Sequence, residues 1–513
     1  MFKPSLDEIK NIASAGQFNI IPVSAEIYSD MVTPIDVLKK LMNVSKHCFI
    51  LESAEDSKTW GRYTFLGFDP GLEITCLNGE MKISSQEKKI NVTGDPNIRI
   101  QEILDQHKSA KFDYLPPFTG GLVGYFAYDY AKYIEPALKL DSSNNESYDE
   151  ERFNDVDLML FDKVIAFDNY KQKIILIVNI KTDNIEDEYK KGIAQLESLK
   201  NLVRTGCYAQ LKQRAQLKQR AHINQRAQIP SANLKSDFKP FFSEDEYCNM
   251  VKRAKEHIKE GNIFQVVLSN RYEAEFEGSI FDTYRALRTI NPSPYMFYFS
   301  GSNLEIAGAS PETLVKLQNG KLFTYPLAGT RKRGETDEED AALEKELLSD
   351  EKELAEHNML VDLGRNDLGK ISRFTTVKVE KYLSVLKFSH VMHIGSTVSG
   401  DICVDKTGLD AINAVLPAGT LSGAPKIRAM QIINEQEKNK RGIYGGAIGY
   451  LDFTGNMDTC IAIRIVYKRN NKVFIRSGAG IVADSNPESE YQECVNKSAA
   501  VRKALELSSG GID

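Results

Sequence analysis

Two acidic patterns far apart in the sequence constrain the fold most, because they gain a common role only if the chain brings them together. The first lies in the segment Ser349–Lys370. Leu354, Met359, Leu360 and Leu363 recur there at helical spacing, which predicts an amphipathic helix. Ser349 or Asp350 can cap the start of this helix, and Gly364 and Gly369 weaken or end it.

Glu353 and Glu356 are three residues apart, so their carboxylates project from one face of the predicted helix. Two neighbouring carboxylates repel each other unless something occupies the space between them, and a hard cation is the usual occupant. A second interpretation stays open. Asp350 followed by Glu353 is also the spacing of a capping box, in which the glutamate bonds back to the backbone.

The segment Pro487–Lys497 repeats the pattern near the end of the chain. Proline suits the first turn of a helix, and Glu490 and Glu493 are again three residues apart. Lys497 continues their face, four residues beyond Glu493. Because Mg²⁺ is held by one or two carboxylates plus water and a substrate anion, two such helices facing each other predict a half-open magnesium site.

Two further candidates follow predicted strands. The apolar run 304–310 stops at a proline and Glu312, where a carboxylate is well placed for acid–base chemistry, although most such residues are only exposed. Residues 326–331 read as a turn in which Gly329 and Thr330 offer backbone and hydroxyl groups to an anion.

His393 lies in a predicted strand, where a histidine is usually a hydrogen-bonded core residue. Downstream, Pro425 fits the first turn of a helix that runs to about Glu437. Thr420 and Ser422 then lie at the N-terminal approach of this helix, a place that binds anions. The spacing of the nearby glycines and lysine excludes a Walker A loop.

The alternating run Asp458–Tyr467 predicts one continuous strand in which Arg464 points to the face of Cys460 and Ala462. A guanidinium among apolar neighbours needs a carboxylate, either from a ligand or from an internal salt bridge. The next strand ends in glycines and alanine at 477–480, where the small side chains let a ligand approach the backbone.

We predict an N-terminal domain over residues 1–204, a linker or insertion over 205–240 and a second domain over 241–513. Residues 210–226 contain a basic repeat without aromatic residues, which favours a polar connection over a nucleic-acid site. The glycine-rich stretch 117–129 is predicted to form a turn.

Composition narrows the class of protein. The net charge of -6 gives no general preference for nucleic acid. Seven cysteines without a C-x-x-C pair favour a reducing compartment. The chain lacks both an N-terminal apolar signal and an apolar run of membrane-spanning length, so we expect a soluble cytoplasmic protein without a membrane partner.

Several motifs together resemble the chorismate-utilising enzymes from about residue 244 to 504: GTLSGAPKIRAMQIINE, YGGAIGYL, DTCIAIR and RSGAGIVADSNPESEYQE. FILES and NPSPYMF resemble the tryptophan-binding elements of the anthranilate-forming members of that family. The resemblance implies an α/β protein of the α+β type, with largely antiparallel sheets packed as a sandwich and surrounded by helices.

The resemblance also implies a reaction and a set of residues. Chorismate would gain ammonia and lose its ring hydroxyl, and elimination of pyruvate would then give anthranilate, the first step of tryptophan biosynthesis. Glu356 and Glu493 would bind Mg²⁺ with support from Glu353 and Glu490, Glu312 would act as general acid, and His393 would assist pyruvate elimination. Substrate-binding positions would be Gly329, Thr330, Thr420, Tyr444, Arg464, Gly478, Ala479, Gly480 and Lys497.

Two positions separate branches of the family. Isochorismate-forming relatives carry a lysine base where this chain has Gln265, and an amide cannot serve as that base. Aminodeoxychorismate-forming relatives often carry a nucleophilic lysine where this chain has Ala328. Both substitutions favour ammonia addition without a covalent enzyme intermediate.

No glutamine-hydrolysing domain is visible in the sequence, so ammonia would come from a glutamine amidotransferase subunit, in a heterodimer or heterotetramer, or from solution. The resemblance further implies feedback inhibition by L-tryptophan. Its binding residues would be Glu52, Ser53, Pro294, Tyr295 and Met296. The alternatives are an aminodeoxychorismate synthase component and an inactive tryptophan-binding regulatory subunit.

Overall fold

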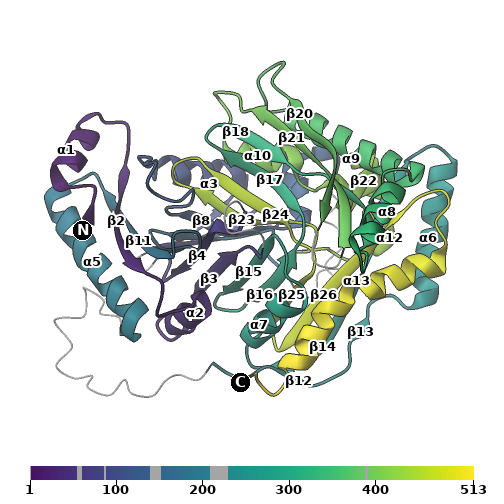
Figure 1. Ribbon diagram of the computed structural model, residues 1–513, viewed down its shortest axis with the longest axis horizontal. Helices are drawn as coiled ribbons and strands as arrows, with labels where there is room; N and C mark the ends of the chain where they lie inside the picture. Colours follow the sequence, from purple (N-terminus) through teal and green to yellow (C-terminus); the bar gives the residue numbers. More distant parts are fainter. Residues whose placement is uncertain are drawn as a thin grey trace.

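The computed structural model describes residues 2–54, 60–85, 88–138, 152–207, 229–387 and 391–512. Its strands form two large antiparallel sheets, one of 14 strands and one of 12 (Figure 1). The two sheets are packed face to face with helices around them, so the α+β sandwich expected from the sequence is confirmed. The basic repeat at 210–226 lies outside the described residues.

The 14-stranded sheet has the spatial order β1 (Phe2–Lys3), β2 (Ile20–Tyr28), β11 (Lys173–Lys181), β10 (Lys163–Asp168), β4 (Tyr63–Phe68), β3 (Cys48–Glu52), β15 (Tyr295–Ser300), β16 (Glu305–Ser310), β25 (Ile465–Arg469), β26 (Lys472–Ile481), β14 (Gln265–Glu277) and β12 (Asn233–Leu234), with β13 (Lys239–Pro240) and β22 (Gly423–Ala424) also paired to β14.

The 12-stranded sheet has the spatial order β19 (Leu327–Lys332), β21 (Val391–Asp401), β18 (Lys321–Thr324), β17 (Thr313–Gln318), β24 (Met457–Ile461), β23 (Ala447–Asp452), β8 (Gly121–Phe126), β9 (Val156–Phe161), β5 (Leu72–Leu77), β6 (Glu80–Ser85) and β7 (Lys89–Thr93), with β20 (Lys378–Lys387) paired to β21.

Each sheet takes strands from both sides of the expected linker. In the first sheet β3 pairs with β15, so that Glu52 lies opposite Met296. In the second sheet β8 pairs with β23, with Phe126 opposite Ala447. Backbone hydrogen bonds therefore run without interruption from the N-terminal strands to the C-terminal strands. The division into domains at 205–240 stays a prediction.

Aromatic side chains fill the space between the sheets. Phe118 lies beside Tyr450 of β23, with ring centroids 4.5 Å apart, and beside Phe49 of β3 at 6.2 Å. Phe65 of β4 meets Tyr450 at 6.0 Å. The Phe118–Tyr450 contact is tilted and the other two are edge-to-face, and such ring contacts stabilise a sandwich through both buried area and ring electrostatics. This aromatic layer fixes the spacing of the two sheets.

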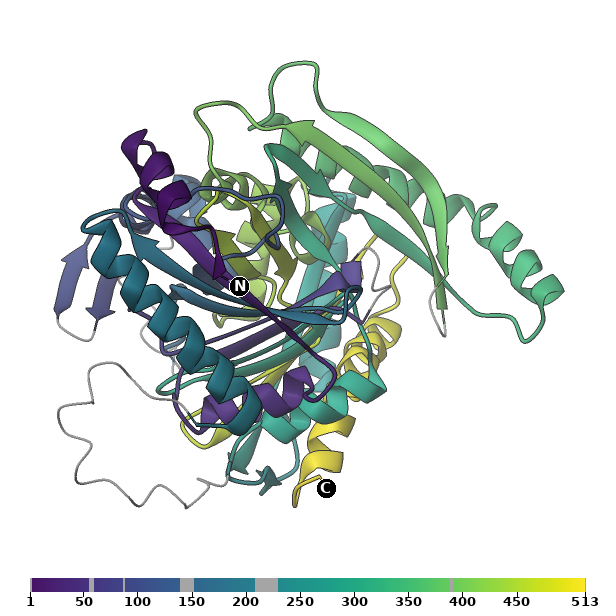
Figure 2. The ribbon, with the colours of Figure 1, turned by 60° about the vertical axis from the view of Figure 1, so that its left-hand side comes forward.

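Helices cover the outer faces. A row of four helices packs on the 14-stranded sheet (Figure 2): α5 (Ile185–Thr205), α2 (Pro34–Met42), α7 (Phe281–Ile290) and α13 (Pro487–Ser508). Helices α3 (Pro96–Asp105), α10 (Gly408–Val415) and α9 (Glu351–Gly369) pack on the other sheet. Within the described residues no helix is long and apolar enough to cross a membrane.

The remaining helices are short or lie at the edges of the sheets: α1 (Leu6–Ser14), α4 (Ala131–Ile134), α6 (Glu244–Lys259), α8 (Asp337–Leu347), α11 (Gly419–Ser422) and α12 (Lys426–Glu437). Helix α6 begins with a capping box, in which Ser243 and Glu246 bond to each other's backbone.

The stretch 117–129 is not the turn predicted from its glycines. Residues 121–126 form β8, a central and fully buried strand. A Cβ added to Gly121 would lie 2.0 Å from the carbonyl oxygen of Leu451, and one added to Gly124 would lie 2.0 Å from that of Asp157. The glycines therefore serve close backbone approach between neighbouring strands.

Candidate active site

Helix α9 begins where the sequence predicts, with the Asp350 side chain accepting hydrogen bonds from the N–H groups of Lys352 and Glu353. The Glu353 carboxylate lies 3.5 Å from the Arg331 guanidinium, across from β19. Asp350 therefore caps the helix, while Glu353 is turned toward the cleft beside β19. Glu356, one turn further on, is solvent accessible.

Helix α13 begins at Pro487, as the sequence predicts, and the Asn486 side chain caps it. Lys497 lies on the same face as Glu493, and its Nζ is 2.6 Å from that carboxylate. The same Nζ donates to the Gly478 carbonyl at 3.1 Å. Lys497 thus links the acidic face of α13 to the end of β26.

The two acidic helices influence each other electrostatically. The loss of surrounding water and the nearby Glu353 raise the pKa of Glu356, and Glu493 on the other helix raises it further. Burial likewise raises the pKa of Glu490, and Lys352 of α9 opposes this shift. Glu356 of α9 and Glu493 of α13 are therefore close enough for their charges to interact.

Among the described residues, no three carboxylate, imidazole or thiol groups are close enough together to enclose a cation. A closed protein cage is therefore absent from this part of the chain. An open arrangement of carboxylates on two helices, each accessible from the cleft, fits a hard ion that keeps water and takes ligands from a bound anion. The donor set suits Mg²⁺ rather than a tetrahedral zinc site.

Glu312 lies between β16 and β17, as expected for a residue at a strand end. Thr420 donates a hydrogen bond of 3.0 Å to its Oε1. Burial raises the pKa of Glu312 to about 7, although Thr420, Lys497 and Arg464 each oppose the shift. A carboxyl group with this pKa can hold and release a proton near neutral pH, as a general acid must.

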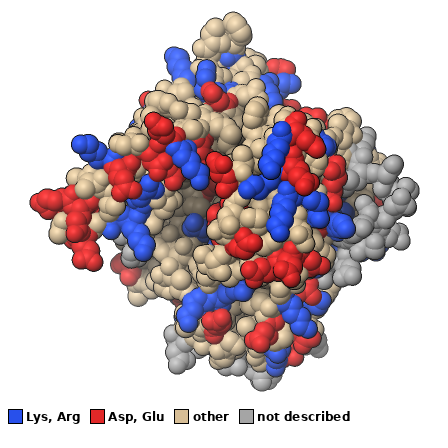
Figure 3. Space-filling view, turned by 90° about the vertical axis from the view of Figure 1, so that its right-hand side faces the viewer, with Lys and Arg blue, Asp and Glu red and all other residues tan. Residues whose placement is uncertain are grey.

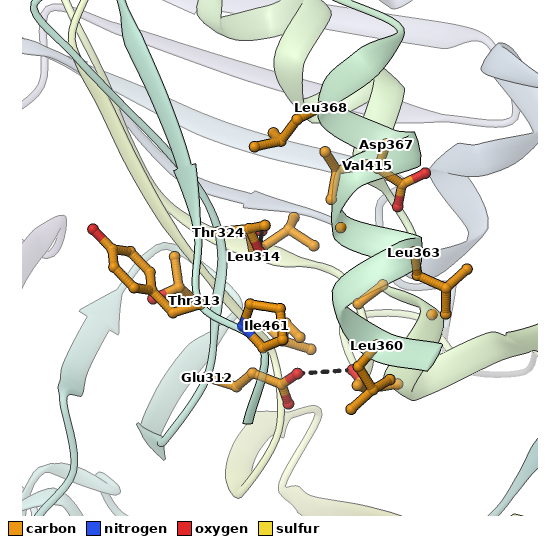
Figure 4. Close-up of a pocket in the computed structure, with 16 residues that line it drawn as sticks. Glu312, Thr313, Leu314, Thr324, Leu360, Leu363, Asp367, Leu368, Val415 and Ile461 are labelled. Atoms are coloured by element: carbon orange, nitrogen blue, oxygen red, sulfur yellow. Dashed lines mark hydrogen bonds between the residues drawn. The ribbon is translucent and has the colours of Figure 1, made fainter. Parts of the chain in front are cut away.

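A small cavity of about 50 Å³ adjoins Glu312 and Thr420. Leu360 and Leu363 of α9 line its opposite wall, and Figure 4 shows the Glu312 carboxylate pointing toward this helix, with its hydrogen bond drawn as a dashed line. The apolar lining accounts for the loss of water around Glu312.

His393 lies in β21, as predicted, and its Nδ1 is 2.8 Å from the Gly329 carbonyl oxygen and 3.0 Å from the Thr330 hydroxyl. A carbonyl oxygen can only accept, so Nδ1 carries the proton and Nε2 has the lone pair. Burial lowers the pKa of His393, which keeps the ring neutral.

Residues 326–331 are not a turn but a strand, β19, with an irregularity between Ala328 and Arg331. Gly329 has φ +66° there, and a Cβ on it would lie 2.9 Å from Leu347. The bulge aims the Gly329 carbonyl at His393, which a regular strand would not do.

The small residues of β26 form one wall. Gly478 lies opposite Ser269 of β14, and Gly480 lies opposite Val267. A Cβ on Gly478 would be 2.9 Å from the Tyr444 hydroxyl, and one on Gly480 would be 2.7 Å from the Gln265 amide nitrogen. Tyr444 and Gln265 therefore lie directly over the bare backbone of β26, with Ala479 between the two glycines.

The run Asp458–Tyr467 is not one strand. β24 ends at Ile461 in the 12-stranded sheet, and β25 begins at Ile465 in the 14-stranded sheet. Arg464 lies at the crossing with φ +52° and is exposed, so the prediction that it points among Cys460 and Ala462 is wrong.

Among the described residues Arg464 has no salt bridge, so the internal carboxylate considered as its partner is not found there. The Arg464 guanidinium is exposed, so leaving it without a salt bridge does not carry the free-energy cost of a buried unpaired charge. Its charge opposes the shift of the Glu312 pKa and contributes to lowering the His393 pKa, so all three groups surround one space. The face on the right-hand side of Figure 1 is hollowed near its centre, with a basic side chain visible inside (Figure 3).

The residues expected to bind tryptophan form a separate group. Glu52 lies opposite Met296, and the Ala54 N–H donates to the Ser293 carbonyl at 3.1 Å, so FILES and NPSPYMF are neighbours. The Glu52 carboxylate accepts from Arg288 of α7 at 2.5 and 3.0 Å.

The side chains of this second group do not all face one space. The Tyr295 hydroxyl donates to Asp458 at 2.8 Å in the layer between the sheets, whereas the buried Met296 belongs to the outer core under the helices. Glu52 shares the face of Met296. Ser53 and Pro294 lie at the adjoining strand ends, where the two motifs meet.

Sequence reasoning missed two groups beside the main site. Arg331 lies 2.8 Å from Asp350 and 2.9 Å from Glu346, next to Glu353. Glu437 and Arg441 form a buried pair behind Tyr444. The signal available in the sequence was the spacing of Glu437 and Arg441, which are four residues apart at a helix end.

Comparison with known proteins agrees with this geometry. Residues 46–503 match the family described as chorismate binding enzyme. Anthranilate synthase component 1 of Acetivibrio thermocellus is 45% identical over 508 residues, covering 99% of both chains. Its counterpart in Aquifex aeolicus is 42% identical over 509 residues, covering 98% of both.

Among solved structures, anthranilate synthase component I from Streptococcus pneumoniae TIGR4 has a TM-score of 0.71 and 39% identity, covering 86% of this chain and 92% of that one. The menaquinone-specific isochorismate synthase of Escherichia coli has a TM-score of 0.67 at 18% identity, covering 98% of this chain and 100% of that one, which shows a shared fold.

The family match over residues 46–503 and the two-sheet fold shared with a 39% identical structure show that the chain belongs to the family of chorismate-binding enzymes. Within it, the full-length matches place the chain in the anthranilate synthase component 1 group.

Proposed function

We propose that this protein is the large subunit of an anthranilate synthase and converts chorismate and ammonia to anthranilate, pyruvate and water. The observation that carries the proposal is Glu312, a carboxyl group with a pKa of about 7 at the edge of a cleft that also holds Arg464 and His393. The full-length similarity to anthranilate synthase component 1 supports the same reaction.

In the first step ammonia forms a bond to the ring, and the ring hydroxyl leaves. The protonated Glu312 gives its proton to the departing hydroxyl, which leaves as water. Thr420, bonded to Glu312 at 3.0 Å, holds the carboxyl group in place for this transfer. Proton transfer from a positioned acid typically contributes about 10²–10⁴-fold in rate.

In the second step a base takes a ring proton and the carbon–oxygen bond to the enolpyruvyl group breaks, which makes the ring aromatic. The released enolpyruvate takes up a proton and becomes pyruvate. His393 is suited to assist, because Gly329 holds its Nδ1–H and burial keeps the ring neutral. Nε2 can then accept a proton.

Residues on two opposite sides of the site would bind the carboxylates of the substrate. Arg464 offers a guanidinium without an internal partner among the described residues, and a planar fork suits a carboxylate. Gly478, Ala479 and Gly480 leave backbone accessible beneath Tyr444. Gly329, Thr330 and Thr420 line the other side, and Lys497 adds positive charge.

Glu356 and Glu493 would hold Mg²⁺, with Glu353 and Glu490 in support. A bound Mg²⁺ would clamp a substrate carboxylate and offset charge as the ring rearranges. Burial raises the pKa of Glu356 and of Glu490, and neighbouring carboxylates raise both further, a repulsion that a bound cation would relieve.

The proposal includes a partner and a regulator. A glutamine amidotransferase subunit would supply ammonia, and L-tryptophan bound near Glu52, Ser53 and Met296 would inhibit. The seven cysteines form no disulfide, which agrees with a cytoplasmic enzyme.

Incubation with chorismate, Mg²⁺ and ammonium tests the function directly. We expect the fluorescence of anthranilate, with pyruvate released in equal amount. A 4-amino product would select the aminodeoxychorismate alternative, and the buried Ala328 argues against it because it offers no nucleophile. Chorismate left unchanged would support the inactive tryptophan-binding alternative.

A further inference from the structure

A buried ion pair lies directly behind the proposed substrate site. Glu437 is the last residue of α12, and Arg441 follows four residues later. Arg441 Nη2 is 2.5 Å from Glu437 Oε1, and Nε is 2.9 Å from Oε2, which is a bidentate arrangement. Both side chains are 1% exposed. The pair is thus held away from water with defined geometry.

Arg441 also bonds to two walls of the site. Nη1 donates to the Leu421 carbonyl at 2.5 Å, and Nη2 donates to the Val267 carbonyl at 2.6 Å. Leu421 follows Thr420, the partner of Glu312. Val267 lies opposite Gly480 in the β14–β26 ladder. One guanidinium therefore links helix α11, which contains Thr420, to the strand that pairs with Gly478–Gly480 of β26.

Glu437 bonds to the same ladder one step away. Its Oε1 accepts from the Ser269 N–H at 2.7 Å and from the Ser269 hydroxyl at 2.9 Å. Ser269 lies opposite Gly478. The Arg441 guanidinium is 5.9 Å from the ring centre of Tyr444, whose hydroxyl lies over Gly478. The pair thus supports Tyr444 and the wall that it covers.

A second arginine makes the cluster cationic. Arg476 Nη1 lies 3.5 Å from Glu437 Oε2, and Arg476 is 1% exposed. Two guanidinium groups against one carboxylate leave one net positive charge behind Tyr444. A buried charge is screened little by water or salt, so it favours an anion in the adjoining cleft.

We propose that Glu437 and Arg441 form a positioning pair that sets the relative placement of helix α11 with Thr420, of Tyr444 and of the Gly478–Gly480 segment of β26 for an anionic, dicarboxylate substrate. The inference rests on the proposed function, since it takes chorismate as the ligand. The competing explanation is a core ion pair that contributes only to stability.

Arg441→Lys tests the proposal, because lysine keeps the charge but cannot bond to Glu437, Leu421 and Val267 in one plane. The matched control is Arg62→Lys. It breaks a similar contact of 3.0 Å with the buried Asp168 at the end of β10, in the N-terminal part of the 14-stranded sheet. For each variant we would measure the melting temperature, kcat and KM for chorismate, and the Kd for chorismate by calorimetry without ammonia.

We expect Arg441→Lys to raise KM and Kd for chorismate at least tenfold more than Arg62→Lys does at a comparable loss of melting temperature. Equal KM and Kd in both variants would overturn the proposal and leave a structural pair. If Arg441→Lys does not fold, Ser269→Ala removes only one hydroxyl donor to Glu437, and we expect a two- to fivefold rise in KM. An unchanged KM in Ser269→Ala would also overturn the proposal.

The calorimetric readout separates the two proposals. Wild-type protein that binds chorismate but forms no anthranilate refutes the proposed function while the positioning pair is still tested by Kd. Wild-type protein that forms anthranilate, with Arg441→Lys unchanged in Kd, refutes only the positioning pair.

Discussion

Thr420 donates a 3.0 Å hydrogen bond to Glu312, although 108 residues separate them in the chain. The contact joins the short helix α11 to the end of β16. It also fixes a carboxyl group whose raised pKa suits proton transfer at neutral pH.

Glu312→Gln should lower kcat by about 10²–10⁴-fold, because an amide cannot donate the proton that the leaving hydroxyl needs. The Kd for chorismate should change little. Anthranilate fluorescence and calorimetry check the two quantities, with Glu197→Gln on the exposed face of α5 as the control. A kcat within threefold of wild type would exclude Glu312 as the acid.

The pH dependence should follow the same group. The acid form of Glu312 is lost as pH rises through about 7, so kcat should fall above that pH. The free energy of unfolding changes with pH in the direction opposite to that expected for a salt-bridged carboxylate. Because the folded pKa is raised, ionisation above the unfolded value of 4.5 costs stability, and this cost grows until pH passes about 7.

Glu312→Gln should therefore be more stable than wild type at pH 8, with a smaller difference at pH 5. Melting temperatures at the two pH values measure this. A variant that is less stable than wild type at pH 8 would contradict the assigned pKa shift.

Glu356→Ala and Glu493→Ala should each abolish magnesium-dependent turnover while leaving the fold intact. Calorimetric titration with Mg²⁺ in the presence of chorismate provides a readout besides activity, and we expect no binding in either variant. Glu506→Ala, further along α13 and paired with Lys503 at 3.9 Å, is the control. Full activity in either cleft variant would rule out the metal assignment.

Gly480→Ala should raise KM for chorismate at least tenfold, because the new Cβ would lie 2.7 Å from the Gln265 amide and must displace it. Gly71→Ala is the matched control, since its Cβ would lie 3.9 Å from Leu160, an ordinary contact. Steady-state kinetics at saturating ammonium measure the difference. Equal KM values for the two variants would argue against the glycine wall as a substrate surface.

Ser53→Ala and Met296→Thr should weaken tryptophan inhibition more than turnover. Loss of one hydrogen bond or of a buried contact is worth about 1 kcal/mol, which corresponds to roughly a fivefold higher inhibitory concentration. Inhibition curves for anthranilate formation check this. Unchanged curves in both variants would count against the second site.

Several local features follow from the sequence alone. The starts of α6, α9 and α13 come from side chains that cap the helix within three residues, so nearby residues suffice to predict them. The acidic pairs of α9 and α13 depend only on helical spacing. The family also follows from the sequence, because its motifs are contiguous segments.

Other features depend on which strands become neighbours. Arg464 reaches the cleft because the chain leaves one sheet at Ile461 and enters the other at Ile465, and an alternating pattern continues across that crossing unchanged. The glycines of β8 are required by the backbones of β9 and β23, which local sequence does not identify. Alternation of side chains along a strand predicts which face of the sheet a residue occupies only while the chain stays in one sheet.

The pairing of Glu437 with Arg441 is local, but the bonds from Arg441 to Val267 and Leu421 are not. The sequence by itself determined the helices, their acidic faces and the family, since these depend on residues a few positions apart. Only the tertiary structure decided which charges are buried and which groups meet in the cleft. Burial and contact between distant segments exist only once the two sheets have packed together.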